Sequence, residues 1–109
     1  MDAMATVTDK TFHTTNALIE YTGCELIVFT APKWARLFFG ILGETLASVK
    51  ERYRINISNI ENAILKETKY KMTFTLFLSD GRVYEMVFEI SDELPHQLKA
   101  DLWDKVSIK

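Results

Sequence analysis

The sequence predicts a mainly β fold of the α+β class, in which about seven antiparallel strands form a split barrel or sandwich and a helix closes the chain. Three observations predict it. Apolar and polar residues alternate along several short segments, residues 70–90 have the pattern of one complete β-hairpin, and an apolar stripe of helical spacing follows. With 109 residues, the chain is long enough for one hydrophobic core and one domain, which we place at residues 12–109.

The first strands are expected after a flexible N-terminus. Residues 1–11 show no periodicity and are predicted to be that flexible terminus. Residues 17–21 and 25–30 alternate well enough for two strands. Thr22 and Gly23, which lie between them, are typical of a turn.

Residues 33–50 have a different pattern. Apolar residues recur at helical spacing along one side, and Gly40 and Gly43 interrupt the segment, so we expect a short apolar helix or an insert broken into turns. Residues 52–57 then alternate again, as on a half-buried antiparallel strand, and residues 60–66 begin the next strand. We expect the strand at residues 52–57 to lie beside the hairpin that follows.

The register of the hairpin at residues 70–90 follows from which residues would share a face. A two-residue loop would place Glu85 opposite Leu76, and a carboxylate would then lie on the apolar face. A three-residue loop at residues 79–81 keeps every inward position apolar, with Gly81 in the left-handed conformation. The pairs that this register predicts are Leu76 with Tyr84, Phe74 with Met86 and Met72 with Phe88.

The chain is expected to end in an amphipathic helix. Ser91 or Asp92 can cap it, and Pro95 is compatible with a helix because it lies in the first turn. One face carries an apolar stripe at intervals of four, flanked by Trp103, and we expect this face to dock on the sheet or across its open end. The stripe consists of Leu94, Leu98, Leu102 and Val106.

The composition favours a globular protein that does not bind nucleic acid. Acidic residues number 15 and basic residues 13, which gives a formal net charge of −2, and the two signs are mixed along the chain. A nucleic-acid-binding domain would instead carry a clustered basic excess. Cys24 is the only cysteine, so no intramolecular disulfide can form, and the sequence shows no secretory leader and no apolar run that could span a membrane. We therefore expect a soluble, cytoplasmic protein.

The order of strands and terminal helix resembles that of pleckstrin-homology-like (PH-like) domains, most closely the small bacterial PH-like and GRAM-like domains. Three segments carry the resemblance: a strand that follows a glycine, an apolar insert interrupted by glycines, and an isoleucine-rich strand and turn, at residues 24–30, 37–43 and 55–60. The resemblance implies a binding module. The phosphoinositide-binding members place several Lys and Arg side chains around the first hairpin loop, whereas the loop predicted here, residues 22–25, has none. The resemblance therefore does not extend to a phosphoinositide site.

The sequence contains no constellation of residues typical of catalysis or metal binding. His13 and His96 are far apart and share no ligand spacing with Cys24, which we expect to be a small buried residue at the start of a strand. Glu85 and Glu89 are spaced as on the solvent face of a strand. Glycine motifs that bind phosphate are absent. We therefore predict that the protein is not an enzyme and has no cofactor and no metal.

The segment at residues 33–50 is the candidate contact site, because it mixes cations and aromatic rings with an apolar stripe. This stripe could simply pack on the domain's own sheet. It could instead bind a protein partner or a second copy of the chain, or lie on a membrane surface, which its few cations favour less. The candidate residues are Lys33, Trp34, Arg36, Phe38, Phe39, Ile41 and Leu42.

These observations define the competing functions. The leading prediction is a non-enzymatic binding or scaffold module for protein–protein interaction or self-assembly. Peripheral attachment to a membrane surface through residues 33–50 is one alternative. A carrier of a small ligand is another, for which Tyr21, Tyr53 and Tyr84 are the candidate polar lining.

Overall fold

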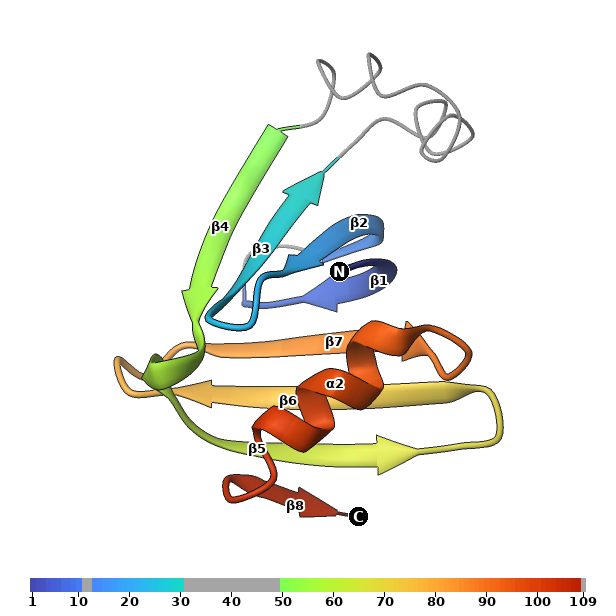
Figure 1. The fold of residues 1–109 in the computed structure, drawn as a ribbon. Helices are drawn as coiled ribbons and strands as arrows, with labels where there is room; N and C mark the ends of the chain where they lie inside the picture. Colours follow the sequence, from blue (N-terminus) through green and yellow to red (C-terminus); the bar gives the residue numbers. More distant parts are fainter. Residues whose placement is uncertain (11–12, 31–49, 109) are drawn as a thin grey trace.

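The computed structural model describes residues 1–10, 13–30 and 50–108. The described strands form one eight-stranded sheet in the order β4-β3-β2-β1-β7-β6-β5-β8 (Figure 1). The sheet curls into a half-barrel with the helix α2 on its concave side, which confirms the predicted fold class. Neighbouring strands are antiparallel except β5 and β8, which run parallel. The elements are β1 (Asp2–Thr8), β2 (His13–Tyr21), β3 (Glu25–Thr30), β4 (Lys50–Asn56), the 3₁₀-helix η2 (Ile57–Asn59), β5 (Ile60–Glu67), β6 (Lys71–Leu78), β7 (Val83–Glu89), α2 (Glu93–Asp101) and β8 (Val106–Ile108).

The N-terminal segment is a strand, so the prediction of a flexible terminus at residues 1–11 is corrected. β1 pairs with β2 on one side and with β7 on the other. Ala3 and Ala5 are buried on its inner face, whereas the larger Met4 lies on the outer face and is only partly buried. Small inward residues and a large outward residue cancel the alternation that usually identifies a half-buried strand.

The hairpin of β6 and β7 has the predicted register. The predicted pairs are all present, namely Leu76 with Tyr84, Phe74 with Met86 and Met72 with Phe88. The N–H of Leu78 donates to the carbonyl oxygen of Arg82 at 2.9 Å, which closes the three-residue loop between them. Gly81 has a φ of +90°, and because side chains with a Cβ rarely adopt this conformation, the loop depends on this glycine.

The strand predicted at residues 52–57 is present as β4, but its neighbour is different from the one expected. β4 lies at one end of the sheet order and pairs with β3, and it does not pair with the hairpin of β6 and β7. The reason is β1, which the sequence pattern does not reveal and which joins β2 to β7. Tyr53 of β4 nevertheless contacts the hairpin, because its ring stacks on that of Tyr84.

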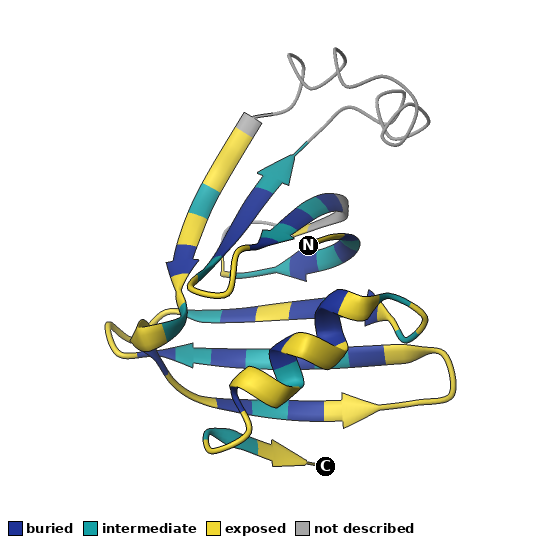
Figure 2. Ribbon diagram, in the orientation of Figure 1, coloured by how far each residue is buried: buried dark blue, intermediate teal, exposed yellow. Residues whose placement is uncertain are grey.

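Alternate strand residues face the concave side and form one hydrophobic core (Figure 2). The rings of Phe74 and Phe88 meet edge to face there, with their centroids 6.0 Å apart. Glu85 and Glu89 of β7 lie on the solvent face, as predicted. Each fully buried Leu or Phe contributes about 2 kcal/mol of hydrophobic stabilisation, so this core is the main source of stability.

α2 has the predicted start and the predicted docking face. Asp92 is its N-cap residue, Pro95 lies in its first turn, and the first three leucines of the stripe are buried. Val106 is a correction, because the helix ends at Asp101 and Val106 begins β8 after a turn. Its side chain still packs against the core. Val106 lies four positions after Leu102, so its spacing fits a longer helix, and it also fits the strand β8. The spacing therefore predicts a helix that is too long.

The helix or insert predicted at residues 33–50 lies outside the described residues, apart from Lys50, where β4 begins. It therefore stays a prediction. Among the helices of the described ranges, none combines the length and the apolar character needed to cross a bilayer.

Candidate functional site

A cavity opens at the end of the half-barrel where the connection from β1 to β2 meets the turn between β6 and β7. Its volume is about 380 Å³, which is within the range of small-ligand pockets, about 300–1,000 Å³. The two segments meet because Thr8 of β1 lies opposite Glu85 of β7. We call this cavity the barrel-end site, and its lining residues are Asp9, Lys10, Asp80, Gly81, Arg82, Val83 and Tyr84.

Arg82 is held at this site by contacts within its own hairpin. Its Nε donates to Oδ2 of Asp80 at 2.6 Å, and its Nη1 donates to the hydroxyl of Tyr84 at 3.1 Å. The backbone N–H of Arg82 donates to Oδ1 of Asp80 at 3.1 Å. This backbone N–H, together with the guanidinium, lowers the pKa of Asp80 below its usual value, so the carboxylate stays charged. A guanidinium has more N–H donors than these contacts use, so Arg82 is oriented and can still bind a ligand.

Tyr53 does not line the cavity, but it stacks on the lining residue Tyr84. Its ring lies on that of Tyr84, with centroids 4.6 Å apart and an angle of 24° between the planes. The Tyr53 hydroxyl is buried and has no hydrogen-bond partner among the described residues. Burial first, and then the neighbouring Tyr84 and Asp9, raise the pKa of Tyr53 above its usual value, so the hydroxyl remains a neutral donor. A buried polar group without a partner costs about 1–3 kcal/mol.

Among the described residues that line the barrel-end site, the charges are balanced. Asp9 and Asp80 supply two carboxylates, and Lys10 and Arg82 supply two cations. A site for a polyanion such as a nucleic acid or a multiply phosphorylated headgroup needs an excess of cations. A ligand that carries both donors and acceptors, as a peptide segment does, matches this balance better.

The structure brings together two of the three tyrosines that the sequence offered as a polar lining. Tyr53 and Tyr84 meet in the stack, whereas Tyr21 lies apart, where its hydroxyl donates to the carboxylate of Asp101 on α2. Burial, followed by the contact with Asp101, raises the pKa of Tyr21. The sequence does not indicate Lys10 as a site residue, because residues 1–11 show no periodicity and are predicted to be a flexible terminus. If β1 were recognisable as a strand, the charged residues Asp9 and Lys10 directly after it would indicate a site at its end.

The first hairpin of the chain is β1–β2, so the expectation that residues 22–25 form the first hairpin loop is wrong. The segment of the sequence between these two strands, after Thr8 and before His13, has Lys10 as its one cation. One cation does not make the basic cluster that the resemblance associates with phosphoinositide binding. With the first hairpin corrected, the resemblance still does not extend to a site for a phosphoinositide headgroup.

The residues predicted to contact a partner or a membrane lie outside the described residues. Lys33, Trp34, Arg36 and the four apolar residues up to Leu42 lie outside the described ranges. Their role stays a prediction.

The histidines and the cysteine lie in separate places. His13 Nδ1 is 2.8 Å from the hydroxyl of Thr8, and His96 Nε2 is 2.7 Å from the carbonyl oxygen of Ile90. Among the described residues, no three side chains of the metal-binding types gather into a site. Cys24 is exposed in the turn before β3, so its predicted burial is wrong. The inward alternation of that strand begins only after it.

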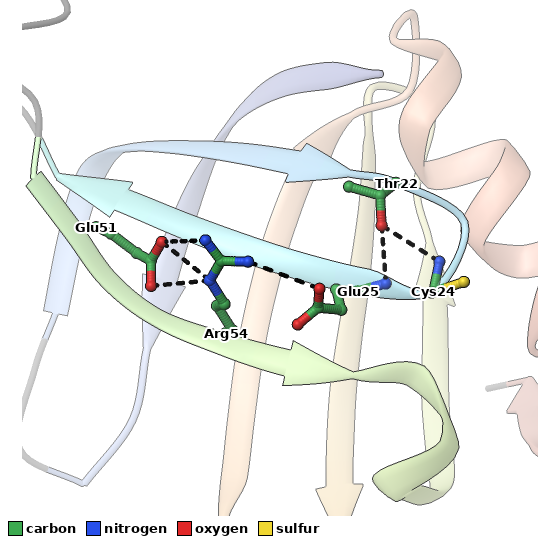
Figure 3. A network of polar contacts seen from close by, with 5 residues as sticks. All are labelled: Thr22, Cys24, Glu25, Glu51 and Arg54. Atoms are coloured by element: carbon green, nitrogen blue, oxygen red, sulfur yellow. Dashed lines mark hydrogen bonds and ion pairs between the residues drawn. The ribbon is translucent and has the colours of Figure 1, made fainter.

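A second polar cluster lies on β3 and β4 (Figure 3). Arg54 forms ion pairs with Glu51 at 2.8 Å and with Glu25 at 3.7 Å. Thr22 Oγ1 accepts hydrogen bonds from the N–H groups of Cys24 and Glu25 at 3.4 and 3.1 Å. Because these groups are exposed, such pairs add little stability. The cluster shapes the turn before β3 and places charges on the β4 edge.

Comparisons with known proteins agree with the architecture. No protein-family model matches the chain, and no curated protein matches it. Among solved structures it is similar to Vav1, in a structure described as "Vav1 inhibited by an allosteric inhibitor: Vav1 inhibitors block GEF activity". The TM-score is 0.59 at 12% sequence identity, over 96% of this chain and 25% of the Vav1 chain. The chain thus spans about a quarter of that neighbour, and at this identity the likeness concerns the fold.

Vav1 contains a PH domain, and the curled half-barrel with its C-terminal helix fits a PH-like fold. The narrower likeness to bacterial or GRAM-like domains and the cytoplasmic location stay predictions. What the strand order, the helix and the structural neighbour establish together is the architecture: the chain is a PH-like split barrel closed by a C-terminal helix.

Proposed function

We propose that the protein is a non-enzymatic binding module that holds a polar segment of a protein partner in the barrel-end site. The observation that carries the proposal is Arg82, which Asp80 and Tyr84 orient at the cavity and which keeps further N–H donors. The buried Tyr53 hydroxyl, a donor without a partner among the described residues, belongs to the ring stacked on the lining residue Tyr84. A backbone carbonyl of the partner would accept from Tyr53, and a carboxylate or carbonyl would accept from Arg82. Asp9 and Asp80 would face the partner's N–H groups or a cation.

The shape and charge of the site support a peptide over other ligands. The cavity of about 380 Å³ is large enough for a few residues of an extended chain. Tyr and Arg are the residue types that most often dominate protein–protein contacts. The balanced charges give no advantage to a polyanion. The structural neighbour contains a PH domain, a module used for binding and scaffolding, which supports a role of the same kind.

The proposal is tested with peptides selected from a random library against the full chain. Their affinity is then measured by calorimetry for the wild type and for Tyr53→Phe, which removes only the unpartnered hydroxyl. We expect binding to weaken about tenfold, because one hydrogen bond to a buried donor is lost. We also expect Arg82→Gln to weaken binding, by at least as much.

Arg54→Gln is the matched control, because Arg54 also pairs with a nearby carboxylate but lies on β4 away from the cavity. Its affinity for the peptides should equal that of the wild type. Peptides that bind Tyr53→Phe and Arg82→Gln as tightly as the wild type would show that the barrel-end site is not the binding site.

Vesicle sedimentation addresses the membrane alternative. We expect no binding to anionic vesicles at low salt. Binding that Phe38→Asp abolishes would replace the proposal with the membrane contact predicted for residues 33–50, and binding that Arg82→Gln abolishes would make the barrel-end site a headgroup site.

A further inference from the structure

Arg82 and Tyr84 present hydrogen-bond donors side by side in the lining of the barrel-end site. Nη1 of Arg82 and the hydroxyl oxygen of Tyr84 are 3.1 Å apart, and Lys10 lines the same cavity. We propose that these donors hold a single carboxylate of the partner, either its C-terminal carboxylate or the side chain of an aspartate or glutamate. The inference rests on the proposed function and names the group that the site recognises.

The guanidinium of Arg82 keeps donors for such a ligand. It carries five N–H groups, and its hydrogen bonds to described residues use two of them, on Nε toward Asp80 and on Nη1 toward Tyr84. The remaining N–H groups belong to Nη1 and Nη2. A carboxylate can accept two parallel hydrogen bonds from a pair of guanidinium nitrogens. Because Asp80 holds the side chain through Nε, the position of this pair is set before a ligand binds.

Tyr84 supplies a further donor at the same place. Its side chain lines the cavity and is only 5% exposed. Its hydroxyl accepts from Arg82, and among the described residues it donates to no acceptor. A buried hydroxyl normally has a partner for its hydrogen as well. A ligand oxygen beside Arg82 would accept that hydrogen, so this part of the cavity favours an acceptor over a donor.

The charges near the cavity match a single negative charge. Burial raises the pKa of the Tyr53 hydroxyl most, and the positive charges of Arg52 and Arg82 act against it, so both lie close to that hydroxyl. Among the described residues that line the cavity, together with Arg52, cations outnumber carboxylates by one. They are Lys10, Arg52 and Arg82 against Asp9 and Asp80. A carboxylate equals this excess, whereas a phosphorylated side chain brings a charge of about −1.5 to −2 at pH 7.

A carboxylate also fits these donors better than an amide does. Hydrogen bonds between two charged groups are roughly twice as strong as those between neutral groups. An amide in the same position would bring its own N–H groups toward those of Arg82. The site should therefore select against the amide as well as for the acid.

Titration of the full chain with N-acetylglycine tests the carboxylate without a peptide. This probe carries one carboxylate, and N-acetylglycinamide is the matched probe that lacks it. We expect N-acetylglycine to shift the NMR amide signals of residues 80–84 with a dissociation constant in the millimolar range, and N-acetylglycinamide to bind at least about tenfold more weakly. Sodium chloride at the same concentration controls for ionic strength.

Variants assign the preference for the acid to the two donors. Arg82→Gln should abolish the preference, and Arg82→Lys, which keeps the charge but not the pair of nitrogens, should retain only part of it. Tyr84→Phe removes the hydroxyl, keeps the ring that stacks on Tyr53 and should reduce the preference. Arg54→Gln and Tyr70→Phe change exposed side chains outside the lining and should leave it unchanged. Circular dichroism checks that each variant is folded.

Peptides selected from a library with free C-termini distinguish the two sources of the carboxylate. Each peptide whose binding depends on Arg82 is made with an amidated C-terminus and, separately, with its Asp and Glu residues replaced by Asn and Gln. We expect one of these changes to weaken binding to the wild type at least about tenfold and to have little effect on binding to Arg82→Gln.

Three results would each overturn the carboxylate. The first is a titration in which N-acetylglycine binds no better than its amide. The second is inorganic phosphate that binds more tightly than N-acetylglycine. The third is a set of peptides that depend on Arg82 but tolerate the loss of every carboxylate, which would leave the proposed function in place. Peptides that ignore Arg82, together with a clear preference for the acid probe, would instead remove the proposed function and keep the carboxylate site.

Discussion

Tyr21, which is buried, and Tyr53, which is half-buried, differ in whether their hydroxyls have partners. The hydroxyl of Tyr21 donates to Asp101 and so links β2 to α2. The hydroxyl of Tyr53 is buried and has no such partner among the described residues. The same chemical group should therefore stabilise the fold at one position and serve another purpose at the other, since a polar group is seldom buried without a partner.

The pair predicts opposite effects of the same substitution. Tyr21→Phe should lower the free energy of unfolding by about 1 kcal/mol, because it removes a hydrogen bond to a carboxylate that is itself exposed. Tyr53→Phe should leave the free energy of unfolding unchanged or raise it slightly, because it removes an unsatisfied hydroxyl. Urea denaturation of both variants measures the difference. Equal destabilisation by the two substitutions would contradict this account and would mean that Tyr53 is a structural residue.

At the scale of elements, α2 closes the concave side of the sheet and is attached at several points. Its leucines enter the core, Asp101 accepts from Tyr21, and Lys99 pairs with Glu67 of β5 at 2.8 Å. The ion pair is partly exposed and contributes little. The apolar face therefore supplies most of the energy that holds the helix on the sheet.

Leu98 provides the test of that statement. Leu98→Ala should lower the free energy of unfolding by about 3 kcal/mol, because it leaves a cavity under the middle of the helix. Trp103→Ala removes a larger side chain that is mostly exposed, and it should cost less than about 0.5 kcal/mol. Thermal and chemical unfolding compare the two variants. A larger loss for Trp103 than for Leu98 would mean that the helix is held by its exposed end.

Whether a sequence predicts an element depends on which side chains face inward. The register of the β6–β7 hairpin was predictable because its inner face is large and apolar, and the one-residue slip of a two-residue loop would bury a glutamate. β1 was not predictable, because its inner face carries Ala3 and Ala5. Val106 fits the helical spacing and the strand equally well, so periodicity alone could not separate α2 from β8.

In the whole molecule, β1 is the strand that unites the sheet. It pairs with β2 on one side and with β7 on the other, so it joins the unit β2–β4 to the unit β5–β8. Without it, Tyr21 and Asp101 would be among the few remaining links between the two units. The segment that looks least structured in the sequence therefore determines whether the half-barrel is one cooperative unit.

Removal of residues 1–9 tests this role. We expect the shortened chain to lose its single cooperative unfolding transition, because both flanking strands lose a partner and the core loses Val7 as well as the alanines. Amide proton dispersion in NMR spectra and a melting curve measure the effect. A melting temperature within a few degrees of that of the full chain, roughly the shift caused by 1 kcal/mol, would restore the flexible terminus that the sequence suggests.

The barrel-end site could not be predicted from the sequence, because its parts come from three places in the chain. Tyr53 lies on β4, Lys10 follows β1, and Arg82 follows the β6–β7 turn. Each has an ordinary role in its local pattern, as a half-buried strand residue, a charged loop residue or part of a turn. The pairing of β1 with β7 brings them together, and that contact depends on the one strand that periodicity does not reveal.

The position of β1 also has a consequence for the order of events during synthesis. The ribosome releases β1 and β2 first, and the strand that completes the pairing of β1 is the last long strand to emerge. At about 5–20 residues per second, β1 waits for seconds with one side unpaired. Until β7 has emerged, one side of β1 has no strand partner, so the half-barrel can be completed only after β7 has left the ribosome.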